Sequence, residues 1–426
     1  MENNTNLTIN SEELKAAFEG GEVKKPKTNQ TPKESPEEKQ GMTKKKLTVF
    51  LILGLVGLIG GGIMLTIALL GMKKDEPTAN YPNLDDEEAE VYYSNLTGEE
   101  LSDKALATAP AYCIQTPNGT DGARPQAGLT DAGVIFEAIA EAGITRFAAI
   151  YQNPTTAIIG PIRSLRIYYL EWDTPFDCTI VHAGGSGDAL AAVSSGGYKD
   201  LTENYTYMYR GTFGGRRWNN LFTTSALLRQ YSSDSGNASS NIKGFTRMTP
   251  KESEQARVDG TVNEKLVITK PAKGDTSTMT PVTTAIRLKF GGVPSYNSSY
   301  TYDAESNKYL RGYESGAAHE VYGCPAEDLG ERNPEDVCSL TQLSPSVVVA
   351  MMVQEHKASD NYHEDIKALG SGKAFVFQNG MAISGTWEKA SKSDQIKFTD
   401  EAGSEIKLAP GQTIVSAVPD YGSVDF

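Results

Sequence analysis

The chain has 426 residues, of which 40 are Lys or Arg and 54 are Asp or Glu, so its formal net charge is −14. An acidic chain without a basic stripe lacks the charge needed to neutralise nucleic-acid phosphates, and we therefore exclude nucleic acid as a partner. The length is sufficient for more than one domain.

The first 46 residues predict a disordered cytoplasmic tail. They are crowded with Asn, Thr, Pro, Glu and Lys and show no apolar period. Such a segment cannot bury enough apolar surface to offset the entropy of the chain.

Residues 47–70, LTVFLILGLVGLIGGGIMLTIALL, predict a single transmembrane helix. The stretch is uncharged, and at about 1.5 Å per residue it is long enough to cross a hydrocarbon core of about 30 Å. Its N-terminal flank holds more Lys than its C-terminal flank, which places the N-terminus in the cytoplasm and the main domains outside it. A cleaved signal peptide would have a much shorter charged leader. We therefore predict a single-pass protein of the cell membrane, with the lipid bilayer as a partner.

An acidic spacer at 71–104 is predicted to hold two outer domains off the bilayer. The first domain covers 105–231 and the second covers 261–426, and the stretch 232–260, rich in Ser, Asn, Gly and charge, is interpreted as a linker or excursion. The predicted fold class is α+β, with a single N-terminal transmembrane helix, a mixed α/β first outer domain and a mostly β second outer domain. The second domain is assigned from β-branched and aromatic runs and from the hairpin signal Asn379-Gly380.

Two interpretations compete for the segment that begins near Asp131. Alternation along Val134–Glu141 and the dipeptide Ala142-Gly143 favour a hairpin with the following run 144–152, whereas three alanines support a helix instead. Either structure would place Glu137 and Glu141 on one face. A two-residue hairpin turn would also set Arg146 opposite Ile139, on that same face.

A polar cluster follows Pro161, a residue suited to the first position of a helix. Arg163, Ser164 and Arg166 would then lie in the opening turns, where free amides and two arginines attract a carboxylate or phosphate. In the competing interpretation both arginines form ion pairs with nearby glutamates and only stabilise the fold.

The next motif is CTIVHAGGSGDAL, which predicts a strand at 179–181, a glycine turn and a helix at 188–194. The turn resembles a backbone cradle for a ligand, but it has neither the Walker spacing nor the dinucleotide-binding spacing. His182 at the strand exit is either a structural group or an assistant in catalysis. The motif contributes His182, Gly184, Gly185, Ser186 and Asp188 to the candidate cleft.

Three blocks carry a family resemblance: ARPQAGLTDAGVIFEAIAEAGITRFAAIYQ, then IGPIRSLRIYY, then FDCTIVHAGGSGDAL. Their order and spacing resemble the N-terminal half of the YerB-like bacterial lipoproteins, a family classed as a domain of unknown function. The block RRWNNLFTTSALL is similar to a later family block, with Asn219 at the place of a family histidine. The resemblance implies a bacterial envelope protein with two linked domains and no assigned activity.

The second half resembles the C-terminal domain of the same family. YTYDAESNKYLRGYESGAAHE places His319 after a strand–turn–strand, and GSGKAFVFQNGMAISGTWEK and LAPGQTIVSAVP resemble the closing strands. Cys324 and Cys338 lie in an insertion relative to the family, where a disulfide between them would close a loop. Cys113 and Cys178 both lie on predicted strands and are either bonded to each other or buried as free thiols.

From these patterns we predict a cell-envelope binding module for an anionic envelope component or partner peptide. The rival hypotheses are an enzyme acting on phosphorylated or glycan cell-wall material, with Glu137, Asp188 or His182 in catalysis, and a scaffold without a ligand. The sequence predicts no cofactor and no metal site. The candidate cleft consists of Arg124, Glu137, Glu141, Arg146, Arg163, Ser164, Arg166, His182, Gly184, Gly185, Ser186, Asp188, Arg217 and Asn220.

Overall fold

The computed structural model describes residues 90–211, 218–264, 279–282, 284–326 and 330–426. The predicted tail at 1–46 and the predicted membrane span at 47–70 lie outside these ranges. Among the helices that the structure describes, none has the length and apolarity needed to cross a bilayer.

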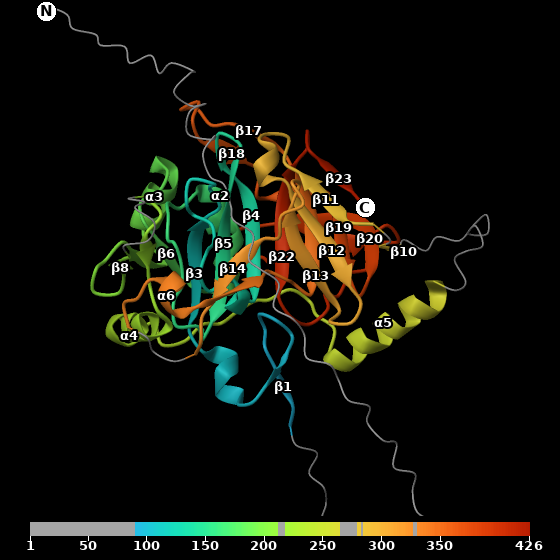
Figure 1. The fold of residues 1–426 in the computed structure, drawn as a ribbon, viewed down its shortest axis with the longest axis horizontal. Coiled ribbons are helices and arrows are strands. Elements are labelled where there is room, and N and C mark those ends of the chain that lie inside the picture. The colour runs from blue at the N-terminus through green and yellow to red at the C-terminus, as the bar shows by residue number, and fades with distance from the viewer. Residues whose placement is uncertain (1–89, 212–217, 265–278, 283, 327–329) are drawn as a thin grey trace, which may run out of the picture. The chain divides into compact units, whose positions relative to one another are not determined.

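The described part is an α+β fold built on one large mixed sheet (Figure 1). Its strands follow the order β10-β20-β19-β16-β22-β4-β5-β3-β6-β7, and β21 pairs with β20. In chain order these strands are β3 (Ala111–Pro117), β4 (Val134–Glu141), β5 (Ile144–Gln152), β6 (Thr179–His182), β7 (Lys199–Thr202), β10 (Met279–Pro281), β16 (Val347–Val353), β19 (Gly370–Gln378), β20 (Met381–Lys389), β21 (Lys397–Asp400) and β22 (Thr413–Pro419).

Strands from both predicted domains share this sheet. β22 from the second half lies parallel to β4 from the first half, with Val415 opposite Phe136, and also parallel to β16. The two large hydrophobic cores, one on each face of the sheet, take residues from both halves. The two halves are therefore joined through their backbones and their cores within the described residues.

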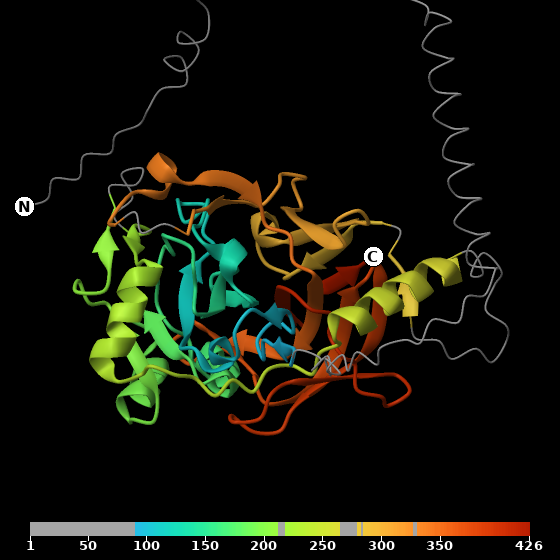
Figure 2. The same cartoon turned by 90° about the horizontal axis from the view of Figure 1, so that it is seen from below.

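Two layers cover the faces of the large sheet (Figures 1 and 2). Helices α2 (Ile167–Asp173) and α3 (Gly187–Ser194) pack on the face that includes Phe136 and Ala138. A four-stranded sheet of order β13-β12-β11-β23 packs on the opposite face. It consists of β11 (Ile286–Lys289), β12 (Ser298–Asp303), β13 (Lys308–Tyr313) and β23 (Ser423–Asp425).

The smaller elements lie around these layers. They are β1 (Tyr92–Tyr93) paired with β2 (Glu100–Leu101), β8 (Tyr209–Arg210) with β9 (Leu221–Phe222), β14 (Glu320–Gly323) with β15 (Ser339–Gln342), β17 (Glu355–Lys357) with β18 (Glu364–Ile366), and the helices α4 (Ser225–Ser235), α5 (Pro250–Glu264) and α6 (Pro334–Val337). Short 3₁₀ turns occupy Lys104–Thr108, Leu129–Asp131, Thr174–Phe176 and Pro294–Tyr296.

Two stretches assigned to connections are more ordered than the sequence analysis expects. Within the spacer, Leu96 is buried in the core between paired strands β1 and β2. Within the linker, α5 begins with a capping box, in which Thr249 and Glu252 each accept a hydrogen bond from the other's backbone amide. The local capping signal outweighs the polar composition that predicts a linker.

The β4–β5 hairpin is confirmed, and the competing helix is wrong. Both turn residues, Ala142 and Gly143, have positive φ, as the tight turns of hairpins require. The predicted register is wrong, because a bulge between Ile139 and Glu141 sets Arg146 opposite Ala138. The extra residue shifts the alternation of side chains, so Glu137 and Glu141 do not share a face.

All four cysteines form disulfides. Cys324 bonds to Cys338, as the loop-closing prediction proposed, and Cys113 bonds to Cys178. The second bond joins β3 to the residue before β6, beside the parallel pairing of these two strands.

Candidate functional site

The candidate site lies at the edge of the sheet where several parallel strands end. β3, β6 and β7 are mutually parallel, as are β4, β22 and β16, and β5 is antiparallel to both β3 and β4. The carboxyl ends of all six strands therefore meet at one edge. Ligands of α/β sheets bind outside such an edge.

A carboxylate and two arginines meet at the end of β4. Arg146 Nη2 lies 2.8 Å from Glu141 Oε1, and Arg166 Nη2 lies 2.5 Å from Glu141 Oε2. Arg146 also donates to the carbonyl of Ser164 at 2.9 Å. Burial alone would raise the pKa of Glu141, but the charges of Arg146 and Arg166 outweigh it and lower the pKa. One carboxylate thus neutralises only one of two buried guanidinium charges.

The expected position of these arginines within a helix is wrong. α2 begins at Ile167, and Arg166 is its N-cap with extended backbone angles. Arg163 and Ser164 lie before it in an extended segment. There the Arg163 amide donates to the backbone carbonyl of Gln115, and the Ala183 amide donates to the Arg163 carbonyl. Because this segment is held by backbone bonds to its neighbours on both sides, the helix starts at Ile167, after the position that Pro161 suggests.

A cleft of about 400 Å³ opens beside Arg166. Arg166, Ser186 and the start of α3 line one wall, and the segment 358–365, which includes the turn between β17 and β18, lines the other. An isolated backbone bridge between Glu141 and His363 holds that segment against the end of β4. Figure 1 shows the β17–β18 hairpin on the side of the sheet where β4 ends.

Two polar atoms in the first wall have no partner among the described residues. They are Arg166 Nε and Ser186 Oγ, both on side chains that are buried to more than nine tenths. Ser186 is the N-cap of α3 but makes no capping hydrogen bond with its side chain. The amides of Gly187 and Asp188 belong to the first helical turn, which has no intrahelical acceptors, and the positive end of the helix dipole lies here. This wall is therefore a place that favours a negatively charged group.

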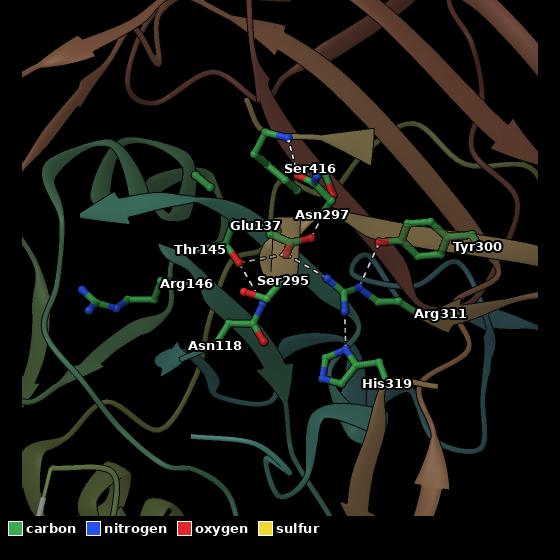
Figure 3. A network of polar contacts seen from close by, with 12 residues as sticks. Asn118, Glu137, Thr145, Arg146, Ser295, Asn297, Tyr300, Arg311, His319 and Ser416 are labelled. Atoms are coloured by element: carbon green, nitrogen blue, oxygen red, sulfur yellow. Dashed lines mark hydrogen bonds and ion pairs between the residues drawn. The ribbon is translucent and has the colours of Figure 1, made fainter. Parts of the chain in front are cut away.

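Glu137 belongs to a different, enclosed network on the opposite face of the sheet (Figure 3). Its Oε1 accepts from Arg311 Nη2 at 2.8 Å and from Thr145 at 3.2 Å, and its Oε2 accepts from Ser416 at 3.2 Å. Glu137 and Arg311 are both fully buried. Figure 3 shows Arg146 pointing away from this network, in keeping with the bulge in β4.

His319 continues the Glu137 network. Its Nδ1 contacts Arg311, which can only donate, and its Nε2 lies 2.9 Å from the side-chain oxygen of Gln126. The ring is therefore the neutral tautomer with its proton on Nε2. Burial and then the charge of Arg311 lower the pKa of His319 well below its usual value. A neutral histidine completes the network without adding a charge.

Models of the family described as protein of unknown function (DUF3048) match this chain twice, the N-terminal domain over residues 96–238 and the C-terminal domain over residues 286–415. The chain belongs to the DUF3048 family. It is 25% identical over 329 residues to the putative lipoprotein YerB of Bacillus subtilis (strain 168), an alignment that covers 76% of this chain and 86% of that protein. The crystal structure of the YerB protein from Bacillus subtilis shares the fold, with a TM-score of 0.60 and 21% identity, over 79% of this chain and 100% of that chain.

In this DUF3048 protein, several candidate residues lie apart from the cleft. His182 is buried, with Nδ1 2.7 Å from the carbonyl of Gly184 and Nε2 2.9 Å from Asp200, so it holds the glycine turn in place. Arg124 stacks on the ring of Tyr313. Asn220 bonds to the carbonyl of Gly211.

The remaining candidates are placed as follows. Arg163 donates to the carbonyl of Trp218 at 3.0 Å. Asn219, at the place of the family histidine, donates to Asp121 at 3.2 Å. Gly185 forms a backbone bridge with Leu165. Arg217 lies outside the described residues.

The structure brings a subset of the candidates together at this edge: Glu141, Arg146, Ser164, Arg166, Ser186 and Asp188. Sequence reasoning missed the second wall of the cleft, formed by residues 358–365 of the other half. No spacing in the sequence relates its charges to Arg166 in the first half.

Proposed function

We propose that this DUF3048 protein is a cell-envelope binding module that holds an anionic group of an envelope component or partner peptide in the cleft beside Arg166. The observation that carries the proposal is the pair of unpartnered atoms, Arg166 Nε and Ser186 Oγ, in one wall. Buried polar atoms are rarely left without a partner, because desolvating them costs free energy. A carboxylate or phosphate bound against this wall would be attracted by the Arg166 charge and accept from the first amides of α3, and a shift of the two side chains would let it accept from these atoms as well.

The proposal includes the location of the protein. The relative YerB carries the word lipoprotein in its name, which supports attachment to a membrane with the folded part outside the cytoplasm. In this chain the apolar residues 47–70 would serve as the anchor, with the N-terminus in the cytoplasm. A single cysteine introduced by Ser35→Cys tests this topology in intact cells. Labelling by a membrane-impermeant maleimide would contradict it, and labelling only after lysis supports it.

The rival enzyme hypothesis is weakened at Glu137 and His182, two of the residues to which it assigns a catalytic role. Glu137 is fully buried in the network with Arg311, and both ring nitrogens of buried His182 already face oxygen atoms. Neither group can exchange a proton with a ligand in the cleft without breaking its contacts. Asp188, which lines the cleft, accepts from the amide of Ala189.

Gly187→Asp tests the binding proposal directly. A Cβ atom at this position meets no atom within 4 Å, so the variant fits the fold. The new carboxylate would occupy the start of α3 and repel an anion, and we expect retention of envelope material by the full-length protein to fall by about tenfold or more. Envelope fractions are incubated with the detergent-solubilised protein on a resin, and bound wall glycan and peptide are quantified.

The matched control is Ser194→Asp, which adds the same charge at the other end of the same exposed helix. Its distance from Gly187 is about 10 Å along the helix axis, so we expect retention to stay at the level of the unaltered protein. Equal retention by all three proteins would contradict the proposed binding site.

A further inference from the structure

We infer that the ligand of this cleft is a short peptide segment that carries both a carboxylate and a primary ammonium group. The inference rests on the proposed function, because it assigns the carboxylate to the wall that contains Arg166 and Ser186. It adds a second recognition element on the opposite wall, and with it a chemical class for the ligand.

Among the residues that line the cleft, the only arginine or lysine, Arg166, lies in the first wall. This wall also has the unpartnered Ser186 Oγ and the start of α3, where the Asp188 carboxylate accepts from the amide of Ala189. The second has three carboxylates within six residues, Asp360, Glu364 and Asp365. A bare dianion such as phosphate would be attracted by the first wall and repelled by the second, whereas a ligand with charges of both signs satisfies both walls.

The carboxylates of the second wall differ in how much acceptor capacity they keep. Asp360 already accepts from the amides of Tyr362 and His363 and contacts the His363 ring, and Glu364 is paired with Lys357. Asp365 has a 3.3 Å contact with His356 through one oxygen only, and its side chain is 55% exposed. Since a carboxylate accepts through both oxygens, Asp365 is the residue that best fits an ammonium group.

The space between the walls suits a peptide of two or three residues. The cleft volume is about 400 Å³, within the range of small-molecule sites. Ile167, Tyr168 and Ala358 also line it, and the Tyr168 hydroxyl is already bonded to the carbonyl of Ile139 at 2.6 Å. The lining therefore offers apolar contact beside the charged groups, as an aliphatic peptide body requires.

Four forms of one probe test the inference: trialanine with free ends, N-acetylated trialanine, trialanine amide and the doubly blocked peptide. Dissociation constants are measured with the full-length protein in detergent by calorimetry, with inorganic phosphate as a fifth ligand. We expect the free peptide to bind most tightly, and amidation of the C-terminus to weaken binding about tenfold or more, as the proposed function also requires. Acetylation of the N-terminus should weaken binding by a similar factor.

Asp365→Asn identifies the wall that holds the ammonium group. In this variant the free peptide should bind about as weakly as the acetylated peptide does to the unaltered protein, and acetylation should have little further effect. The control is Glu401→Gln, which removes an exposed carboxylate from the turn after β21, at the other end of the sheet. Thermal unfolding curves of both variants check that the fold is intact.

The outcomes separate the two proposals. Equal binding of free and acetylated peptide, with weak binding of the amide, would overturn the ammonium assignment and leave the anion site intact. Equal binding of all four peptides would overturn both. Failure of the free peptide to bind at millimolar concentration, or tighter binding of inorganic phosphate, would overturn the peptide class while the envelope retention of Gly187→Asp still decides the anion site.

Discussion

Glu137 and Glu141 lie on the same strand, yet they occupy two very different regions of the molecule. Glu137 faces the interface with the small sheet and is enclosed with one arginine and a neutral histidine. Glu141 lies at the open edge of the large sheet with two arginines and a cleft nearby. The bulge between Ile139 and Glu141 directs the two glutamate side chains to different faces. In the enclosed network one carboxylate neutralises one arginine, and this network stabilises the fold. At the strand end one carboxylate faces two arginines, so a positive charge remains that can attract a ligand.

Removal of Arg311 should have the largest effect, because it breaks the closed network. Arg311→Met leaves the Glu137 carboxylate buried without a counter-charge, and we expect the free energy of unfolding to fall by about 3 to 5 kcal/mol. Chemical denaturation of the full-length protein in detergent measures the loss. The double variant Glu137→Gln with Arg311→Met should recover part of it, and failure to recover would indicate that lost packing rather than charge dominates.

Loss of Glu141 should cost less, because this cluster is closer to solvent. Glu141→Gln leaves Arg146 and Arg166 without their shared carboxylate, but the glutamate side chain is 14% exposed, so water can screen part of the repulsion. We expect a loss of about 2 kcal/mol in the same denaturation measurement. A loss as large as that of Arg311→Met would mean that the edge cluster is as closed as the interior network.

The two regions should also respond to pH in opposite directions. His319 in the closed network has a pKa well below its usual 6.5. Below pH 6.5 the unfolded chain therefore binds a proton at this histidine before the folded chain does. Its stabilising contribution is complete above pH 6.5 and declines as the pH falls below that value. His319→Gln should flatten this acid limb of the stability profile.

At the edge, Glu355 has the reverse behaviour. Burial and then neighbouring Glu364 raise the pKa of Glu355 from 4.5 to about 7, against the opposing hydrogen bond from Tyr421. Its contribution is complete below pH 4.5 and is lost as the pH rises through about 7. Glu355→Gln should remove a decline of about 1 kcal/mol over this range. An unchanged slope in the variant would contradict the assignment.

Features set by neighbouring residues can be predicted from the sequence, whereas contacts between distant residues cannot. The β4–β5 hairpin follows from local alternation and from Ala142-Gly143, and the family blocks identify both halves of the fold. The bulge in β4 has no local signal, and it separates Glu137 from Glu141 and Arg146, which the sequence predicts on one face. The Glu137–Arg311 pair joins residues 174 positions apart, which no spacing rule relates.

The cleft is hidden from the sequence for the same reason. Its walls come from segments in different halves, brought together because β22 inserts between β4 and β16. The linker helix is a different case, since the capping box at Thr249 and Glu252 is legible in the sequence. There the polar composition predicts a linker, whereas the local cap indicates a helix.

Ser186→Ala should have the smallest effect on stability and so separates binding from folding most cleanly. Its hydroxyl oxygen is buried without a partner among the described residues, so its removal leaves no donor or acceptor newly unsatisfied. We expect the free energy of unfolding to stay within about 0.5 kcal/mol of the unaltered protein, while retention of envelope material falls severalfold. A clear loss of stability would instead show that the hydroxyl has a partner within the protein. The polar groups at the edge would then be satisfied without a ligand, like those of the network around Glu137.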